Sequence, residues 1–159
     1  MAIMIGDRIP EANIQRIREG FETVDTHALF EGRKLLLFSV PGAFTPTCSE
    51  KHLPGFVTLF DKFRDKGVSV ACMSVNDPFV MKAWAASQNV PDGMEVLADG
   101  NGDFTRALGL EMDASAYGMG LRSKRFALLA ENGVVRRLEV EAPGEFRVSS
   151  AEHMLSLLD

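Results

Sequence analysis

One cysteine of this 159-residue chain stands where a helix is expected to begin, and a cysteine in that position can act as a nucleophile. Residues 41–48 read PGAFTPTC, and they directly follow a nearly continuous apolar run, 34–40, that is typical of a strand buried on both faces. The first turn of a helix presents free backbone N–H groups and the positive end of the helix dipole, and both favour thiolate over thiol. Cys48 is therefore the candidate nucleophile.

Two threonines are candidate caps for this helix, and both place the Cys48 sulfur in its first turn. Thr45 can be the cap with Pro46 as the first helical residue, because proline is favoured in that position. Thr47 can be the cap instead, with Glu50 completing a capping box. The sequence leaves both alternatives open.

The neighbours of Cys48 favour some thiolate chemistries over others. A dithiol oxidoreductase uses Cys-x-x-Cys, but Thr45 and Lys51 occupy the positions three residues before and after Cys48. A cysteine hydrolase needs a histidine base, and His52 lies one helical turn away on the same face. Nothing in the sequence indicates an oxyanion hole or a third orienting residue, so a hydrolase that uses Cys48 and His52 is the weaker hypothesis.

The elements that would position Cys48 alternate between strands and helices and end in an antiparallel hairpin. In chain order we expect a hairpin at 13–18 and 21–25, a helical turn at 26–30, a strand at 34–40, the Cys48 helix to Gly67, a strand at 68–75, a helix from 76–78 to about 88, a strand at 95–98, a helix at 103–108, a hairpin at 126–130 and 134–140, and a closing helix to 158. This order predicts a single thioredoxin-like α/β domain over residues 1–159. Its mixed central sheet carries helices on both faces and an N-terminal hairpin.

Local signals predict three further details of these helices. Thr26 is the expected cap of the turn at 26–30, and Ser149 with Glu152 forms a capping-box pattern that would open the last helix. The pair Pro54-Gly55 should kink or interrupt the Cys48 helix, because proline lacks a backbone N–H.

Composition excludes several classes of function. With 46% hydrophobic residues the chain can bury one good core, and a net charge of −5 argues against nucleic acid or an anionic membrane surface as a partner. No apolar run approaches the roughly 20 residues of a membrane span, and no signal or transit peptide is visible. Two cysteines and three scattered histidines show no metal-ligand spacing. We expect a cytoplasmic protein with no metal or organic cofactor.

Residues 41–48 match the active-site pattern Pro-x-x-x-Thr-x-x-Cys of peroxiredoxins. Read on through Ser49 and the HLPGF run at 52–56, the sequence resembles the type II, peroxiredoxin-5-like branch of that family. Shorter matches follow at 74–77 (SVND), 98–102 (ADGNG) and 122–126 (RSKRF). The resemblance covers most of the chain, and its long motif is highly specific. It implies a thiol peroxidase that reduces hydrogen peroxide and small organic hydroperoxides.

The resemblance also implies roles for named residues. Cys48 would be the peroxidatic nucleophile, and the Thr45 hydroxyl would accept a hydrogen bond from the peroxide and donate one to the sulfur. Pro41 would shield the thiolate from bulk water. The family's arginine precedes an aromatic residue at the start of the last hairpin, which favours Arg125 over its competitor Arg122. A guanidinium offers permanent charge and several fixed donors to the thiolate and to the leaving oxygen.

The second cysteine, Cys72, lies in the middle of the strand at 68–75 and is expected to be a packed, inert thiol. Some relatives carry a resolving cysteine in a C-terminal loop, but residues 147–150 contain none. The sulfenic acid formed on Cys48 would then be resolved by an external thiol, which makes this a 1-Cys enzyme. We expect glutathione and glutaredoxin as the reductant, with thioredoxin as the alternative.

Two further expectations concern partners. The resemblance implies a homodimer with contacts around the active-site loops, for which Phe44 is a candidate interface residue. A redox-sensing binding protein is the competing function, in which oxidation of Cys48 would change a partner interface. Rapid recycling of the oxidised protein by a thiol system would distinguish the peroxidase from the sensor.

Overall fold

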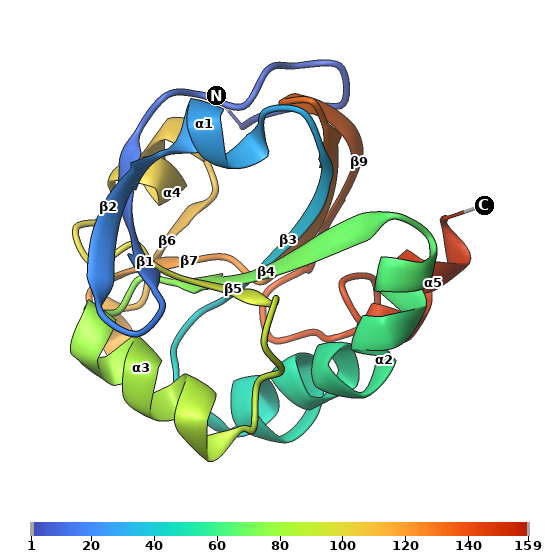
Figure 1. Cartoon of the computed structure of the whole chain (residues 1–159). Coiled ribbons are helices and arrows are strands. Elements are labelled where there is room, and N and C mark those ends of the chain that lie inside the picture. Colours follow the sequence, from blue (N-terminus) through green and yellow to red (C-terminus); the bar gives the residue numbers. More distant parts are fainter. Residues whose placement is uncertain (1, 159) are drawn as a thin grey trace.

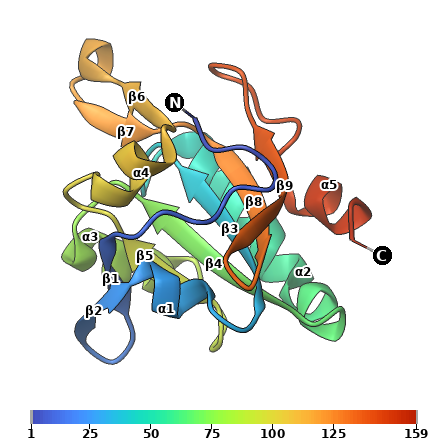
Figure 2. The same cartoon turned by 90° about the horizontal axis from the view of Figure 1, so that it is seen from above.

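A seven-stranded mixed sheet with helices on both faces forms the body of the computed structural model, which describes residues 2–158 (Figures 1 and 2). The two end residues of the expected 1–159 domain, Met1 and Asp159, lie outside the described part. The sheet order is β2-β1-β5-β4-β3-β8-β9. Its strands are β1 (Asn13–Ile17), β2 (Phe21–Asp25), β3 (Lys34–Val40), β4 (Val68–Ser74), β5 (Glu95–Ala98), β8 (Phe126–Glu131) and β9 (Val134–Val140). β4 runs parallel to both β3 and β5, whereas the outer pairs are antiparallel.

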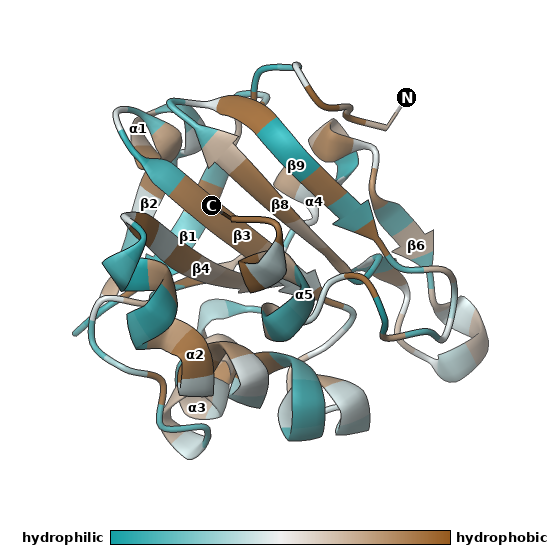
Figure 3. Cartoon of the chain, turned by 90° about the vertical axis from the view of Figure 1, so that its right-hand side faces the viewer, coloured by the Kyte–Doolittle hydropathy of each residue, from teal (hydrophilic) through white to brown (hydrophobic). Residues whose placement is uncertain are grey.

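Helices cover the sheet on both sides, as the sequence predicted. They are α1 (Thr26–Phe30), α2 (Leu53–Asp65), α3 (Pro78–Ser87), α4 (Asp103–Leu108) and α5 (Ala151–Ser156). Leu36 and Phe38 of β3 pack in one core with α2, α3 and α5, whereas Leu35 and Leu37 point into a second core with α1 and α4. The central strands are therefore apolar on both faces, and they appear brown along most of their length in Figure 3. This arrangement is the expected thioredoxin-like α/β fold.

The helix that carries Cys48 begins at Pro46, which puts Thr45 in the cap position. The alternative cap is wrong, because Thr47 already has helical backbone angles (φ −63°, ψ −38°) and its side chain makes no capping hydrogen bond. A π-helical turn spans Cys48–His52, and α2 then continues through Pro54. The expected break at Pro54-Gly55 is thus replaced by a wide turn just before it. A π turn is compatible with the residues that follow, because Pro54 has no backbone N–H to donate in the regular series of α-helical hydrogen bonds.

Two other predicted caps are wrong by one residue. Asp25, not Thr26, caps α1, and the Thr26 hydroxyl instead donates to the Pro10 carbonyl. Ser150, not Ser149, caps α5 by accepting from the His153 N–H. Adjacent residues are equally good caps by type, so long-range contacts decide between them.

A small two-stranded ribbon, β6 (Glu111–Asp113) with β7 (Leu121–Ser123), was not predicted from the sequence. A 3₁₀ turn at Ser115–Tyr117 lies between the two strands. The strands have only three residues each, which is too short to show an alternating pattern. The ribbon brings Met119 and Arg122 next to the loop that precedes Cys48.

Candidate active site

Cys48 lies in the π turn beyond the carboxyl end of β3, and its side chain is completely buried. The loop before it is fixed from the neighbouring strand: the Ala43 N–H donates to Asn76 Oδ1 at 2.9 Å, and the Ser74 hydroxyl donates to the same oxygen at 2.6 Å. On the other side of the turn, the Trp84 indole N–H donates to the Ser49 hydroxyl at 2.9 Å. The thiol is therefore held in a well-anchored turn.

Arg125 is the arginine that reaches the thiol. It stands directly before β8, and its Nη2 donates to Cys48 Sγ at 3.1 Å. Arg122 lies beside Gly42 instead, where its guanidinium donates to the carbonyls of Met119 (2.9 Å) and Val75 (3.1 Å). Of the two candidates, only Arg125 contacts the sulfur.

His52 holds the other side of the Arg125 guanidinium. Arg125 Nη1 donates to His52 Nδ1 at 3.0 Å, and His52 Nε2 donates to the Ser149 carbonyl at 2.9 Å. Guanidinium can only donate and a carbonyl can only accept, so these contacts fix the neutral ring with its proton on Nε2. Burial and the nearby charge of Arg125 lower the pKa of His52 to about 3. With both nitrogens engaged, His52 has no free position to act as a hydrolase base, which argues against that hypothesis.

Thr45 and Pro41 lie in the loop that leads to Cys48, and both are half-buried. The Thr45 hydroxyl donates to the Gly42 carbonyl at 2.6 Å rather than to the sulfur, which differs from the expected donor role. Its oxygen lone pairs remain able to accept a hydrogen bond. Pro41 directly follows the last residue of β3.

Cys72 lies in the middle of β4, between Phe38 on β3 and Val96 on β5. Its thiol is free and buried in the same core as Cys48. Burial, and to a smaller extent the neighbouring Cys48, raises the pKa of the Cys72 thiol far above its usual value. Such a thiol is inert as long as the sheet stays closed.

A C-terminal loop covers this site, and sequence reasoning missed it. Residues 142–149 lead from β9 to α5 and carry Phe146, whose ring centroid lies 5.0 Å from that of His52. The same ring lies 5.8 Å from the Arg125 guanidinium carbon. The loop is held by the buried Glu141, which accepts from the backbone N–H groups of residues 147–149. These residues stand 94 to 101 positions after Cys48, and no local pattern links them to it.

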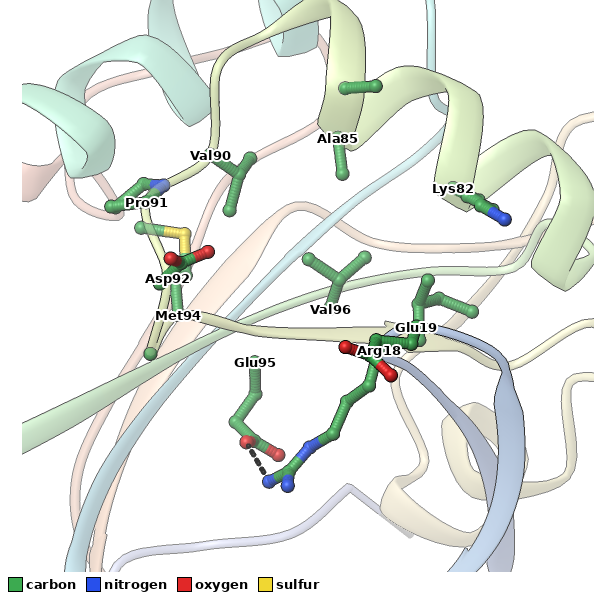
Figure 4. A pocket seen from close by; sticks show the side chains of 13 residues that line it. Arg18, Glu19, Lys82, Ala85, Val90, Pro91, Asp92, Met94, Glu95 and Val96 are labelled. Carbon is green, nitrogen blue, oxygen red and sulfur yellow. Dashed lines mark hydrogen bonds and ion pairs between the residues drawn. The ribbon is translucent and has the colours of Figure 1, made fainter.

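The molecule also has a groove of about 600 Å³ that shares no residue with the Cys48 site and lies between α3, β5 and the turn that joins β1 to β2 (Figure 4). Its apolar floor includes Val90, Met94 and Val96, and its rim carries an ion pair between Arg18 and Glu95 at 3.2 Å. The lining includes neither a cysteine nor a histidine. This groove therefore lacks the thiol and the imidazole that lie together at the Cys48 site.

A thioredoxin-like domain that presents a cysteine in the first turn of a helix belongs to the class of thiol-dependent oxidoreductases. The redoxin family model matches residues 4–155. The chain is 46% identical over 159 residues to Peroxiredoxin-2C of Arabidopsis thaliana, with 98% of each chain covered. It is 40% identical to Hybrid peroxiredoxin hyPrx5 of Haemophilus influenzae, over 99% of this chain and 67% of that protein.

The same relationship holds in three dimensions. The structure of reduced Prx3 from Vibrio vulnificus in complex with hydrogen peroxide matches with a TM-score of 0.94 and 50% identity, covering 99% of both chains. This chain therefore belongs to the redoxin family and is a peroxiredoxin, an oxidoreductase that reduces peroxides with electrons from thiols. Within residues 2–158, none of the helices has the length and apolar character that crossing a membrane requires.

Proposed function

We propose that Cys48 is the peroxidatic nucleophile of this peroxidase and that Arg125 stabilises the reacting atoms. The observation that carries this assignment is the 3.1 Å hydrogen bond from Arg125 Nη2 to Cys48 Sγ. The thiolate attacks the terminal peroxide oxygen, an S–O bond forms as the O–O bond breaks, and the leaving oxygen takes a proton and departs as water or an alcohol. A positive donor beside both the sulfur and the leaving oxygen stabilises the charge that moves between them.

Thr45 and Pro41 are proposed to complete the site. The Thr45 hydroxyl donates its own proton to the Gly42 carbonyl, so its lone pairs can accept from the terminal oxygen of the peroxide. Pro41 limits access of bulk water to the sulfur. Because Cys48 is fully buried behind these half-buried residues, the proposed substrates are hydrogen peroxide and small organic hydroperoxides.

We propose a 1-Cys cycle that an external thiol closes. Cys48 sulfenic acid condenses with glutathione to a mixed disulfide and water, and glutaredoxin or a second glutathione then releases the Cys48 thiol. The burial of Cys72 in β4 supports this cycle, because that thiol would have to leave the sheet to reach the sulfenic acid. The first turn must open during resolution, since the Cys48 sulfur is itself buried.

The cycle is tested by oxidising the reduced protein with one equivalent of hydrogen peroxide and adding one thiol system at a time. With glutathione alone we expect the intact mass to show one glutathione on Cys48, and added glutaredoxin should restore the thiol. The Cys72→Ala protein should behave in the same way. Rapid turnover with thioredoxin and its reductase alone would contradict the proposed reductant, and an intramolecular disulfide would contradict the 1-Cys assignment.

We also propose a homodimer that forms around the active-site loops. Three apolar side chains at that end of the sheet are partly or largely exposed: Phe44 (56%) in the loop before Cys48, Phe79 (72%) in α3 and Leu121 (37%) in β7. Phe44 has a positive φ of 64°, an uncommon backbone conformation for a bulky residue that turns its ring outward. Sedimentation should show a dimer, and Phe44→Ser should weaken it. A wild-type monomer at high concentration would refute the dimer.

The proposed cycle needs no bound metal or organic cofactor, because both half-reactions use only thiols and the peroxide. Activity should survive dialysis against a chelator, and its loss would contradict this proposal. We further propose a reducing setting such as the cytoplasm, which two free cysteines support.

A further inference from the structure

Glu141, the residue directly after β9, has a carboxylate that holds three consecutive backbone N–H groups. Glu141 Oε2 accepts from the N–H groups of Arg147, Val148 and Ser149, each at 2.8 Å, and from the Ser149 hydroxyl at 2.7 Å. Its other oxygen, Oε1, accepts from the Arg147 N–H at 2.9 Å. Hydrogen bonds to an ionised carboxylate are about twice as strong as neutral ones, so this side chain fixes the loop at 147–149 firmly.

The anchored loop is the support of His52. The Ser149 carbonyl is the acceptor for His52 Nε2, at 2.9 Å, and His52 is completely buried. No water can replace that acceptor while the site stays closed. The position of Ser149 therefore sets the position of the ring, and the ring's Nδ1 in turn receives Arg125 Nη1 at 3.0 Å.

Glu141 also contacts Arg125 through the backbone. Its N–H donates to the Arg125 carbonyl at 2.9 Å, so the main chain of Arg125 and the loop that supports His52 are tied to one residue. The same loop presses the Phe146 ring against both His52 and the Arg125 guanidinium. The guanidinium is thus held by His52 and Phe146, both supported by the loop that the Glu141 carboxylate anchors, whereas the backbone contact from Glu141 fixes only the main chain of Arg125.

We propose that Glu141 is a positioning residue for the peroxidase reaction, acting through the loop at 147–149 and His52 to hold Arg125 against Cys48. Glu141 touches neither the sulfur nor the substrate in this account. Its effect on Cys48 passes through Arg125. The inference rests on the proposed function of Cys48 and Arg125, and it assigns a role to residues outside the active-site motif.

A double-mutant comparison separates this role from a general loss of packing. Glu141→Ala should slow oxidation of Cys48 by hydrogen peroxide about ten-fold, and Glu141→Gln should fall between it and wild type because its amide oxygen still accepts hydrogen bonds. In an Arg125→Ala background, Glu141→Ala should cause no further ten-fold loss, since the group through which it acts is gone. Glu139→Gln removes a charge in β9, two positions before Glu141, where Glu139 lies 3.6 Å from His153, and it should react like wild type.

Proton NMR of the His52 ring provides a second readout that needs no peroxide, because the Ser149 carbonyl holds the Nε2 proton. Loss of the Glu141 side chain should shift this proton resonance or hasten its exchange with water, and Glu139→Gln should leave it unchanged. Equal losses of rate in both Arg125 backgrounds, or an unchanged His52 resonance in Glu141→Ala, would overturn the inference. If wild-type protein reacts slowly with peroxide, the proposed function of Cys48 fails, and the His52 resonance still decides the role of Glu141.

Discussion

Lowering the pH below about 6.5 should destabilise the folded chain through one buried side chain, His52. Its Nδ1 accepts from the Arg125 guanidinium, so a proton there would set two positive groups against each other. Burial, the larger cause, and the charge of Arg125 lower the pKa of His52 from its ordinary 6.5 to about 3 in the folded state. Between these two values the unfolded chain binds a proton that the folded chain does not.

The free energy of unfolding must therefore fall as the pH falls through this window. The contribution of His52 is fully present above about 6.5, decreases by about 1.4 kcal/mol for each pH unit, and is exhausted below about 3. Across the whole window this amounts to about 5 kcal/mol, which is comparable to the entire stability of many domains. Acid lability of this size from a single histidine follows from its complete burial.

Urea denaturation over a series of pH values, followed by Trp84 fluorescence, measures this effect in wild type and in His52→Gln. Glutamine can accept from Arg125 and donate to the Ser149 carbonyl, but it does not titrate. Carboxylates such as Glu141 titrate in both proteins, so the difference between the two proteins isolates His52. The wild-type advantage should shrink by about 1.4 kcal/mol per pH unit below about 6.5. A difference that stays constant with pH would refute the reasoning.

Other substitutions test single contacts. Arg125→Lys keeps the charge but loses the two guanidinium nitrogens that donate to Cys48 and His52. Oxidation by peroxide should then slow about ten-fold in rapid mixing, and an unchanged rate would contradict the role of the guanidinium geometry. Cys72→Ala should keep the peroxide reaction and lower the free energy of unfolding by about 1 kcal/mol; lost turnover with glutathione would make Cys72 the resolving thiol. Ser49→Ala leaves the buried Trp84 N–H without its acceptor and should cost about 1–3 kcal/mol in urea denaturation, whereas unchanged stability would mean that the N–H finds another partner.

Most of the fold could be predicted because its strongest signals are local. The run at 34–40 is nearly continuously apolar and matches the bounds of β3, and Asn132-Gly133 places the turn between β8 and β9. Helix caps were less predictable where two suitable residues adjoin. Ser150 caps α5 in place of Ser149, because the Ser149 hydroxyl donates to Glu141 instead. No local pattern reveals that contact.

The residues of the site likewise fall into those with a local sequence signal and those placed only by long-range contacts. Cys48 and Arg125 follow from motifs at their own positions, and the structure brings the two together. The contributions of Glu141 and Phe146 could not be predicted, since they reach Cys48 only through His52 and Arg125 after the chain has folded. Side-chain networks between distant segments depend on packing, and packing is what the sequence pattern does not specify.

Rapid mixing of the reduced protein with one equivalent of hydrogen peroxide tests the central claim most directly, with Trp84 fluorescence and intact mass as readouts. Trp84 donates to Ser49, the residue after Cys48, so its emission should report a change in that turn. We expect a fast gain of one oxygen on Cys48, absent in Cys48→Ser and greatly slowed in Arg125→Ala. Oxidation of wild type no faster than that of a free thiol, or an unchanged rate without Arg125, would contradict the account.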